Sequence, residues 1–461
     1  MKQNLINSLT EIVGEVNILH SGAEKERFTH IWKTDIPLEA KAVVFPNSTE
    51  QVSQIMKYCH RENQEVIIHG GLTNLVGGTE TESNQLVIAL DKMNAIQEVD
   101  VQSRTITAQS GAILEHMIDA AAEKQLLLPM SFGSKGSAQI GGVVSTNAGG
   151  LRVFRYGMTR QMVLGIEAVL PDGTIISSLK KTIKDNSGYD LKQFFIGSEG
   201  TLGIITKIIL RLSEAPSSRS SAIVGIKTYD NVIKVLKFLE KNLAGTLSGF
   251  ELMWQDTYKA MTGEASHLNP PLNSEYNYYV FVESLGSQPK EDYSRLENLI
   301  SESLEMELIQ DGVMAQSERE LNTIWQIRED VSILAAQANY DQHFDISIPI
   351  PLIGELVKKA TEELYKLPFV ERVFSFGHVA DGNIHYIIGK KDNTPEIIEA
   401  INQIIYKPLK EVGGSVSAEH GIGLHKKAYL HTSRSKEEIE LMKIIKKTFD
   451  SKNILNPGRI F

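Results

Sequence analysis

Residues 133–150, GSKGSAQIGGVVSTNAGG, are the segment most informative about the fold. Its glycines are interleaved with serine, threonine and asparagine, which lets a ligand approach the backbone closely. Ordinary core packing seldom needs so many small residues together. We therefore expect this stretch to line a pyrophosphate or a flavin ring, with a plain series of tight turns as the alternative.

Two further glycine loops lie on either side of it, at residues 67–74 (IIHGGLTN) and 195–205 (FIGSEGTLGII). Successive backbone N–H groups at the end of a strand can form a nest for an anionic phosphate. The first of these loops has neither the Gly-Lys-Ser/Thr of a Walker loop nor the GxGxxG of a nicotinamide site. A tight turn without a ligand is the alternative for residues 67–74.

The composition is that of a globular protein with a large core. The chain has 461 residues, of which 42% are hydrophobic and 23% charged, and a formal charge of −10. The acidic balance argues against nucleic acid as the main partner. The single cysteine, Cys59, excludes an internal disulfide and cysteine-ligated clusters and fits a reducing, cytoplasmic location. No apolar segment is long enough to predict a membrane span, and no signal peptide pattern is present.

The alternation of helical and strand patterns predicts an α+β chain. A serine- and proline-rich change of texture at residues 213–221 marks a domain boundary. The expected parts are an N-terminal helical segment (1–36), a glycine-rich domain (37–215), a second domain (216–410) and a C-terminal segment (411–461). Strands are expected at 43–45, 65–69, 86–90, 105–109, 204–212 and 278–283. Helices are expected near the N-terminus, after Ser48, and at 113–124, 230–241, 290–305, 353–366, 396–412 and 436–450.

Together these motifs resemble the FAD-binding domain of the vanillyl-alcohol oxidase/p-cresol methylhydroxylase superfamily. The resemblance covers about residues 37–212, including KDNSGYDL at 184–191, and continues through a substrate domain to NILNPG at 453–458. The chain is most similar to FAD-dependent D-2-hydroxyacid dehydrogenases of the D-2-hydroxyglutarate and D-lactate branches. This implies a two-part FAD-binding domain, an α+β substrate (cap) domain and a C-terminal helical segment that returns to the flavin.

The resemblance also implies which residues hold FAD. His69 replaces the usual arginine, which predicts a weaker charge contact to phosphate. Thr73 stands where some relatives attach the flavin through a histidine, so we expect dissociable FAD. The implied cofactor-binding residues are Pro46, His69, Gly70, Gly71, Leu72, Thr73, Asn74, Gly136, Ser137, Gly141, Gly142, Thr146, Asn147, Gly149, Gly150, Glu199, Gly200, Gly203, Ile205 and Asn456.

A second kind of motif lies at residues 376–385, FGHVADGNIH. Asp-Gly predicts a hairpin turn, which would bring His378 and His385 together as neutral nitrogen ligands. With Glu419 as a third ligand, they would form a set typical of catalytic zinc or another divalent metal. Hairpin histidines without a metal are the alternative. The resemblance favours the metal, because the D-2-hydroxyglutarate branch binds one through residues that match all three positions.

His420 is the candidate for the catalytic base. Oxidation of a 2-hydroxy acid removes the hydroxyl proton while the C2 hydrogen leaves as hydride for flavin N5. Histidine titrates in the required range, and a metal on the hydroxyl would lower its pKa. The alternative is a histidine that only orients Glu419.

Three positions concern the substrate. Arg328 matches the family arginine that binds the substrate carboxylate, for which a planar guanidinium is suited. Considered alone, an arginine beside Glu329 and Asp330 more often forms a surface ion pair. Ser332 stands where relatives carry threonine. His343 replaces a family lysine, and Ile387 replaces an asparagine, which predicts a less charged or more apolar substrate than 2-hydroxyglutarate.

The expected activity is FAD-dependent oxidation of a D-2-hydroxy acid, similar to D-2-hydroxyglutarate or D-lactate, to the 2-oxo acid. No haem or iron–sulfur motif is present, so electrons would pass to an external acceptor such as a quinone or an electron-transfer flavoprotein. The alternatives are a transferase of the alkyl-glycerone-phosphate synthase type and a flavin-binding subunit of a larger oxidase. A homodimer is a further expectation.

Overall fold

A computed structural model describes residues 2–32, 34, 37–263 and 266–461. These residues divide into two compact units. The first unit runs to Gly149 and adds Gly157–Ala215 and Glu419–Phe461, and the second comprises Gly150–Tyr156 and Pro216–Ala418.

The chain enters the second unit at Ala215–Pro216, within the predicted change of texture, and leaves it at Ala418–Glu419. The expected boundary at residues 410/411 lies earlier, because a bridge between Ser415 and Ser347 ties this part of the chain to the second unit. Residues 1, 33, 35 and 36 of the predicted N-terminal segment lie outside the described residues, and the remainder of that segment belongs to the first unit.

One sheet of the first unit has the strand order β1-β2-β4-β3, with β2, β4 and β3 parallel. Its strands are nearly continuous apolar runs, as expected where both faces are covered. The Ser48 hydroxyl caps α2, which packs with α1 and this sheet around Leu9, Ile55 and Leu86. The elements are α1 (Lys2–Val13), β1 (Ile18–Leu19), β2 (Ala42–Val44), α2 (Thr49–Glu62), β3 (Val66–His69) and β4 (Leu86–Ala89).

The other main sheet of this unit is antiparallel, in the order β5-β6-β10-β8-β9, and β7 pairs with β11. Its core contains side chains of α3 and α4, including Met117 and Val144. The elements are β5 (Ile96–Asp100), β6 (Thr105–Gln109), α3 (Leu114–Ala122), β7 (Leu126–Leu127), α4 (Ile140–Ser145), α6 (Thr159–Met162), β8 (Val163–Val169), β9 (Ile175–Ser178), α7 (Lys192–Phe195), β10 (Ile204–Arg211), β11 (Ser213–Glu214) and α16 (Lys436–Phe449).

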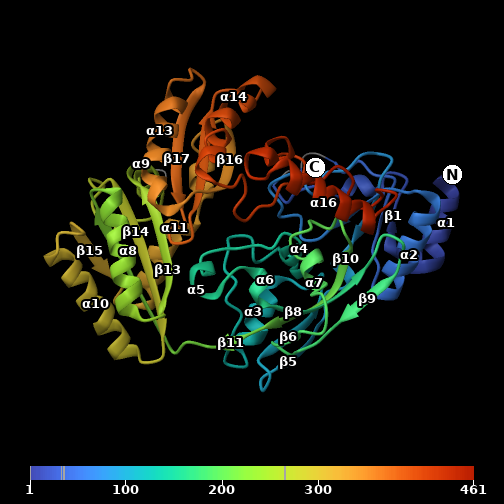
Figure 1. The fold of residues 1–461 in the computed structure, drawn as a ribbon, viewed down its shortest axis with the longest axis horizontal. Helices are drawn as coiled ribbons and strands as arrows, with labels where there is room; N and C mark the ends of the chain where they lie inside the picture. Colours follow the sequence, from blue (N-terminus) through green and yellow to red (C-terminus); the bar gives the residue numbers. More distant parts are fainter. Residues whose placement is uncertain (1, 33, 35–36, 264–265) are drawn as a thin grey trace. The chain divides into compact units, whose positions relative to one another are not determined.

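The second unit is built on an antiparallel sheet in the order β15-β12-β14-β13-β17-β18-β16. Helices α8 and α10 lie side by side against β12–β14, and α13 packs on β17 (Figure 1). The elements are α5 (Val153–Tyr156), β12 (Ser218–Ile226), α8 (Tyr229–Leu243), β13 (Leu247–Trp254), α9 (Gln255–Thr262), β14 (Tyr278–Gly286), α10 (Pro289–Glu305), β15 (Asp311–Met314), α11 (Glu318–Glu329), α12 (Ser332–Ala335), β16 (Tyr340–Ser347), α13 (Ile353–Tyr365), β17 (Val370–Gly377), β18 (Asn383–Lys390), α14 (Pro395–Tyr406) and α15 (Leu409–Val412).

The face of this sheet that carries α9, α11 and α12 is the one that matters for function. Met253, Phe281 and Ile387 point into its apolar core. Because side chains alternate along a strand, Glu251 and His385, two residues from Met253 and Ile387, are on the same face. The face therefore combines an apolar core with ionisable groups.

Two sequence predictions about elements were wrong. The helix expected at 396–412 is two helices, α14 and α15, since Pro408 has no N–H to continue the helical hydrogen bonds. The segment at 1–36, expected to be helical, also contains the short strand β1, which pairs with β2. The other predicted elements are confirmed to within a few residues at their ends. In the part of the chain that the structure describes, no helix has both the length and the apolarity that a bilayer crossing requires.

Candidate active site

The three glycine loops of the first unit are packed against one another. A Cβ atom on Gly71 would lie 1.9 Å from the Ser137 carbonyl oxygen, so glycine is required where these two loops meet. The backbone N–H of Gly197 donates to the Val144 oxygen at 3.1 Å. The loops that the sequence assigned to one cofactor thus lie together.

The predicted residues Pro46 and His69 lie at the ends of neighbouring elements of this unit. Pro46 follows β2 and His69 closes β3, and these parallel strands finish at the same edge of their sheet. Ligands of open parallel sheets bind outside the carboxyl ends of the strands. The strand ends and the glycine loops are therefore in the expected relationship to a nucleotide.

The C-terminal segment returns to these loops through Asn456. Its Oδ1 accepts the N–H of Ile68 at 2.9 Å, and its Nδ2 donates to the Glu199 carbonyl oxygen at 2.8 Å. Leu455 forms a parallel bridge with Val66 at the edge of β3. Asn456 therefore links the loop after β3 to the loop at 197–205.

His69 is fully buried and gives no positive charge to this site. Its Nε2–H donates to the Thr79 carbonyl oxygen at 2.9 Å. Burial lowers the pKa of the imidazole to about 3, so the ring is neutral near pH 7. The neutral ring therefore offers no charge to a phosphate at this position. This agrees with the weaker contact expected from the replacement of arginine by His69.

The residues present fit FAD. The Oε1 atom of Gln139 is buried and has no hydrogen-bond partner among the described residues, and it lies 3.6 Å from where a Cβ on Gly70 would be. Since buried polar atoms are seldom left unpaired, this acceptor suits a donor group of a bound cofactor. A Cβ on Gly142 would meet nothing within 4 Å, which leaves open space beside α4.

Glu199 is one of the predicted cofactor-binding residues, and its side chain contacts the C-terminal segment of the same unit. Its carboxylate accepts the backbone N–H groups of Ile422 and Gly423, both at 2.7 Å. Burial raises the pKa of this carboxyl, and the two N–H groups counteract the effect. Glu199 therefore binds the turn that follows His420, and an anionic phosphate would be repelled at this point.

In the second unit, Glu251 connects two predicted site residues. Its Oε2 is 2.7 Å from Nη2 of Arg328, and its Oε1 accepts a hydrogen bond from Nδ1 of His378 at 2.5 Å. Burial opposes ionisation of Glu251, but the neighbouring His378 and Arg328 hold its pKa below the usual value. The guanidinium also stacks on the Phe376 ring at 4.8 Å. Arg328 is thus a buried, oriented cation and not a surface ion pair.

The predicted hairpin is confirmed, because β17 and β18 pair on either side of Asp381-Gly382. Gly382 has φ +86°, a left-handed conformation that favours glycine. The rings of His378 and His385 lie 5.3 Å apart, with ligand nitrogens within 4.8 Å of each other. The hairpin therefore brings together two imidazoles, as the sequence predicted.

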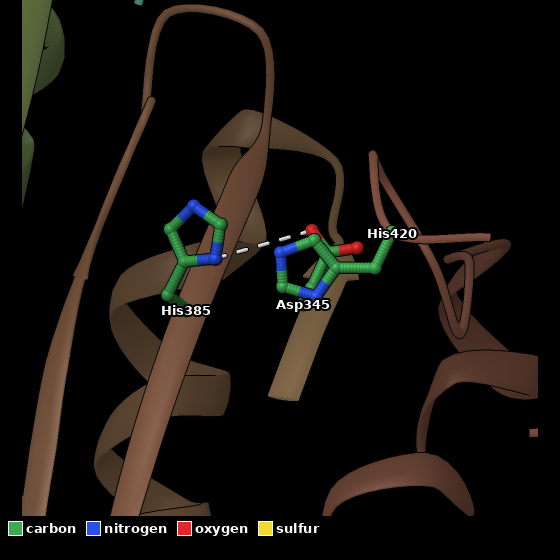
Figure 2. Close-up of side chains that lie close together, drawn as sticks. All are labelled: Asp345, His385 and His420. Carbon is green, nitrogen blue, oxygen red and sulfur yellow. Dashed lines mark ion pairs between the residues drawn. The ribbon is translucent and has the colours of Figure 1, made fainter. Parts of the chain in front are cut away.

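Asp345 on β16 lies opposite His385 on β18. Figure 2 shows this pair, with His385 Nδ1 at 4.0 Å from the carboxylate. Asp345 also accepts hydrogen bonds from the Ser417 hydroxyl and the Ala418 N–H, both at 3.1 Å. It fixes the residues directly before Glu419 and His420, which belong to the first unit.

The remaining predicted substrate residues are more accessible. Ser332 is exposed and donates to Asp330, and His343 hydrogen-bonds to Asp341 at 2.7 Å. His343 lies opposite Ile387, which is buried in the apolar core. The two positions that depart from the family pattern are therefore cross-strand neighbours.

Sequence reasoning missed Glu251 and Asp345. Glu251 lies within an otherwise apolar strand segment and Asp345 lies between Phe344 and Ile346, and a buried acid is rare unless it is paired. That signal was present in the sequence.

Sequence reasoning also missed a buried group in which Glu283 accepts Arg152 at 3.1 Å and Arg219 at 2.6 Å. Gly150, predicted to bind cofactor, begins the short segment that carries Arg152 in the second unit.

Comparison with known families agrees with this geometry. Residues 215–460 match the family described as "FAD linked oxidases, C-terminal domain", and residues 40–178 match "FAD binding domain". The chain belongs to the FAD-linked oxidases. Within this family it groups with the FAD-dependent D-2-hydroxyacid dehydrogenases, as the motifs predicted.

Three curated relatives illustrate the grouping. A candidate mitochondrial D-lactate dehydrogenase of Schizosaccharomyces pombe is 38% identical, over 97% of this chain and 88% of the relative. A mitochondrial D-2-hydroxyglutarate dehydrogenase of Arabidopsis thaliana is 35% identical, over 99% and 81%. A D-2-hydroxyglutarate–pyruvate transhydrogenase of Saccharomyces cerevisiae is 34% identical, over 97% and 92%. This FAD-linked oxidase therefore shares nearly its whole length with dehydrogenases.

Solved structures confirm the predicted α+β fold. Substrate-bound p-cresol methylhydroxylase superposes with a TM-score of 0.79 at 16% identity, covering 99% of this chain and 96% of that one. An alkyldihydroxyacetonephosphate synthase superposes with a TM-score of 0.76 at 17% identity, covering 98% and 85%. At these identities the similarity establishes the fold of this oxidase and nothing about its chemistry.

Proposed function

We propose that this FAD-linked oxidase converts a D-2-hydroxy acid to the 2-oxo acid. The observation that carries the proposal is the buried group of Arg328, His378 and His385 on one face of the second unit's sheet, with Glu251 joining the first two. In this proposal, Arg328 binds the substrate carboxylate and the two imidazoles beside it hold a metal ion. The named activities of the relatives, D-lactate and D-2-hydroxyglutarate dehydrogenases, agree with such a substrate.

Arg328 binds the substrate carboxylate in this proposal. Glu251 occupies the Nε and Nη2 side of the guanidinium, and in the described part of the chain Nη1 makes no hydrogen bond. The Phe376 ring holds the guanidinium plane, so its free edge is already oriented for a carboxylate. Ser332, four residues later, would donate a hydrogen bond from its hydroxyl to the substrate in place of Asp330.

His378 and His385 suit a divalent metal such as zinc, with Glu419 as the third ligand. The bond from Nδ1 of His378 to Glu251 leaves Nε2 as the ligand atom, an arrangement typical of metal-binding histidines. Glu419 follows Ala418, whose N–H is bound to Asp345, and consecutive Cα atoms are about 3.8 Å apart. A bound metal ion would lower the pKa of the substrate hydroxyl.

His420 would accept the hydroxyl proton of the substrate, and bound FAD would supply the acceptor for the C2 hydrogen and its two bonding electrons. The carbon–oxygen single bond becomes a carbonyl, so one proton and one hydride account for the two-electron oxidation. The electrons would then pass to an external acceptor, for which we propose a quinone or an electron-transfer flavoprotein. Thr73 offers no imidazole to the flavin, which supports non-covalent FAD.

Within the 2-hydroxy acids, we propose a substrate closer to D-lactate than to D-2-hydroxyglutarate. The observation is the cross-strand pair of His343 and Ile387. A second substrate carboxylate would meet a partly exposed imidazole bound to Asp341 and a buried isoleucine, in place of a lysine and an asparagine. A small, less charged side chain is better accommodated.

Location and assembly are further proposals. Cys59 is buried, and burial raises the pKa of its thiol to about 12, so it stays protonated and fits a reducing compartment such as the cytoplasm. Cell fractionation would test this, and two of the relatives above are named as mitochondrial. Sedimentation of the FAD-loaded protein would test the proposed homodimer.

The activity is tested with the FAD-loaded protein, an electron-accepting dye and a panel of D- and L-2-hydroxy acids. We expect dye reduction with D acids and formation of the matching 2-oxo acid, identified by mass. Activity with L acids only, or with none, would contradict the proposal. A flavin that no hydroxy acid reduces would instead support a transferase.

A further inference from the structure

The turn that carries Glu419 and His420 is held at both ends by carboxylates. Before it, Asp345 of the second unit accepts Ser417 Oγ and Ala418 N, both at 3.1 Å. After it, Glu199 of the first unit accepts the N–H groups of Ile422 and Gly423, both at 2.7 Å. Each carboxylate thus fixes the chain on its own side of the Ala418–Glu419 crossing.

Glu199 is itself rigidly placed among the glycine loops. Its N–H donates to the Ser145 oxygen at 2.8 Å, and its carbonyl oxygen accepts Asn456 Nδ2 at 2.8 Å. The side chain is partly buried, and the backbone has φ +51°. Glu199 therefore links the loops at 136–150 and 197–205 to the turn through hydrogen bonds.

The turn is shaped to reach this carboxylate. Gly421 has φ +85°, and a Cβ there would lie 2.9 Å from Glu199 Oε1. Gly423 has φ +52°, and a Cβ there would lie 2.2 Å from the Val76 oxygen. Each oxygen of the Glu199 carboxylate accepts one of the two backbone N–H groups. The arrangement requires glycine at 421 and 423 and an acid at 199.

The same unit also places Glu419. A Cβ on Gly149 would lie 2.5 Å from Glu419 Oε1, so this carboxylate rests on the backbone of the loop at 136–150. Glu419 and the residues that follow His420 are therefore held against glycine loops, while Ser417 and Ala418 are held on the sheet that carries His385.

We propose that Glu199 and Asp345 are positioning residues, which hold residues 417–423 so that Glu419 and His420 keep a fixed place for the reaction. The inference rests on the proposed function, in which these two residues are a metal ligand and a base. Neither positioning carboxylate needs to contact the substrate. Small misplacements of reacting groups are costly, about 100-fold in rate for about 1 Å.

The test is Glu199→Gln in the FAD-loaded protein. The amide keeps the size of the side chain but presents N–H groups to a backbone that also donates, so at least one hydrogen bond is lost. We expect faster hydrogen–deuterium exchange in residues 418–426 and a kcat about 10- to 100-fold lower, with KM changed less than about threefold. The pH profile of kcat should also shift, while the FAD-to-protein ratio stays the same.

Glu167→Gln is the matched control. Glu167 is another buried carboxylate of the same unit, bound to Thr49 and Lys207, away from the turn. It should leave exchange at 418–426 and the pH profile unchanged. Ser417→Ala, which removes one donor to Asp345, should change both readouts in the same direction as Glu199→Gln but less.

Unchanged exchange and an unchanged pH profile in folded, FAD-loaded Glu199→Gln would overturn the inference. If that variant does not fold, the same two readouts in Ser417→Ala and Glu199→Asp decide the question. If the unaltered protein oxidises no D-2-hydroxy acid, the proposed function fails, and the exchange measurement still shows whether Glu199 holds the turn.

Discussion

One carboxylate, that of Glu251, divides its two oxygens between Arg328 and His378. Oε2 lies 2.7 Å from Arg328 Nη2, and Oε1 lies 2.5 Å from His378 Nδ1. The proposed substrate cation and one proposed metal ligand are therefore oriented by the same buried group. Any change in Glu251 should affect both functions together.

Glu251→Gln should weaken metal binding and substrate binding at once. The amide has no charge to balance Arg328, and it is a weaker acceptor for His378 Nδ1–H. Removal of such a partner typically lowers metal affinity or activity about 10- to 100-fold. Metal content after dialysis and KM for the hydroxy acid are the measurements. Glu283→Gln, at an equally buried acid paired with Arg152, is the control that should retain the metal.

His378→Ala and His385→Ala should each reduce bound metal and the rate of FAD reduction. A chelator should have the same effect on the unaltered protein, and added Zn²⁺ should reverse it. The physical reason is the loss of the ion that lowers the pKa of the substrate hydroxyl. Equal rates with and without chelator, and in both variants, would exclude the metal role.

His343→Lys should shift preference towards D-2-hydroxyglutarate. A lysine at this position supplies the cation that relatives place there, and a gain of about tenfold in kcat/KM for the dicarboxylic acid over D-lactate corresponds to about 1.4 kcal/mol. His343→Gln is the control and should give no such gain. An unchanged ratio in the lysine variant would show that this position does not read the second carboxylate.

The stability of the first unit should depend on pH through His69. The folded pKa is about 3, below the ordinary value of 6.5, so the unfolded chain takes up a proton that the folded one refuses. The stabilisation is complete above pH 6.5 and is lost as pH falls, by at most about 1.4 kcal/mol per pH unit from this group. Denaturant unfolding between pH 6.5 and 5 should show a smaller slope in His69→Gln than in His431→Gln, which changes an exposed histidine.

The sequence predicted the parts of this site that depend on local pattern. Asp381-Gly382 determines its own turn, so the approach of His378 and His385 could be predicted from ten residues. Glu251 could not be assigned in the same way, because its contact with His378 depends on β13 pairing with β17, more than a hundred residues later. The contact between Glu251 and His378 depends on this non-local strand pairing, which the local sequence pattern does not indicate.

The same distinction applies to Glu199 and to the fold. Glycine-rich segments predicted that loops far apart in the chain would serve one cofactor, and the loops do pack together. The partner of the Glu199 side chain lies some 220 residues later, on a turn whose return to the first unit no local pattern indicates. Pro408, by contrast, is a helix-breaking residue visible in the sequence, and the prediction of one helix at 396–412 did not take it into account.

Anaerobic titration of the FAD-loaded protein with D- and L-2-hydroxy acids is the direct test of whether a D-2-hydroxy acid reduces the flavin. We expect the visible absorbance of the oxidised flavin to disappear on addition of a D acid such as D-lactate and to persist with its L enantiomer. Oxidised flavin that persists with every D-2-hydroxy acid tested would contradict the proposed function.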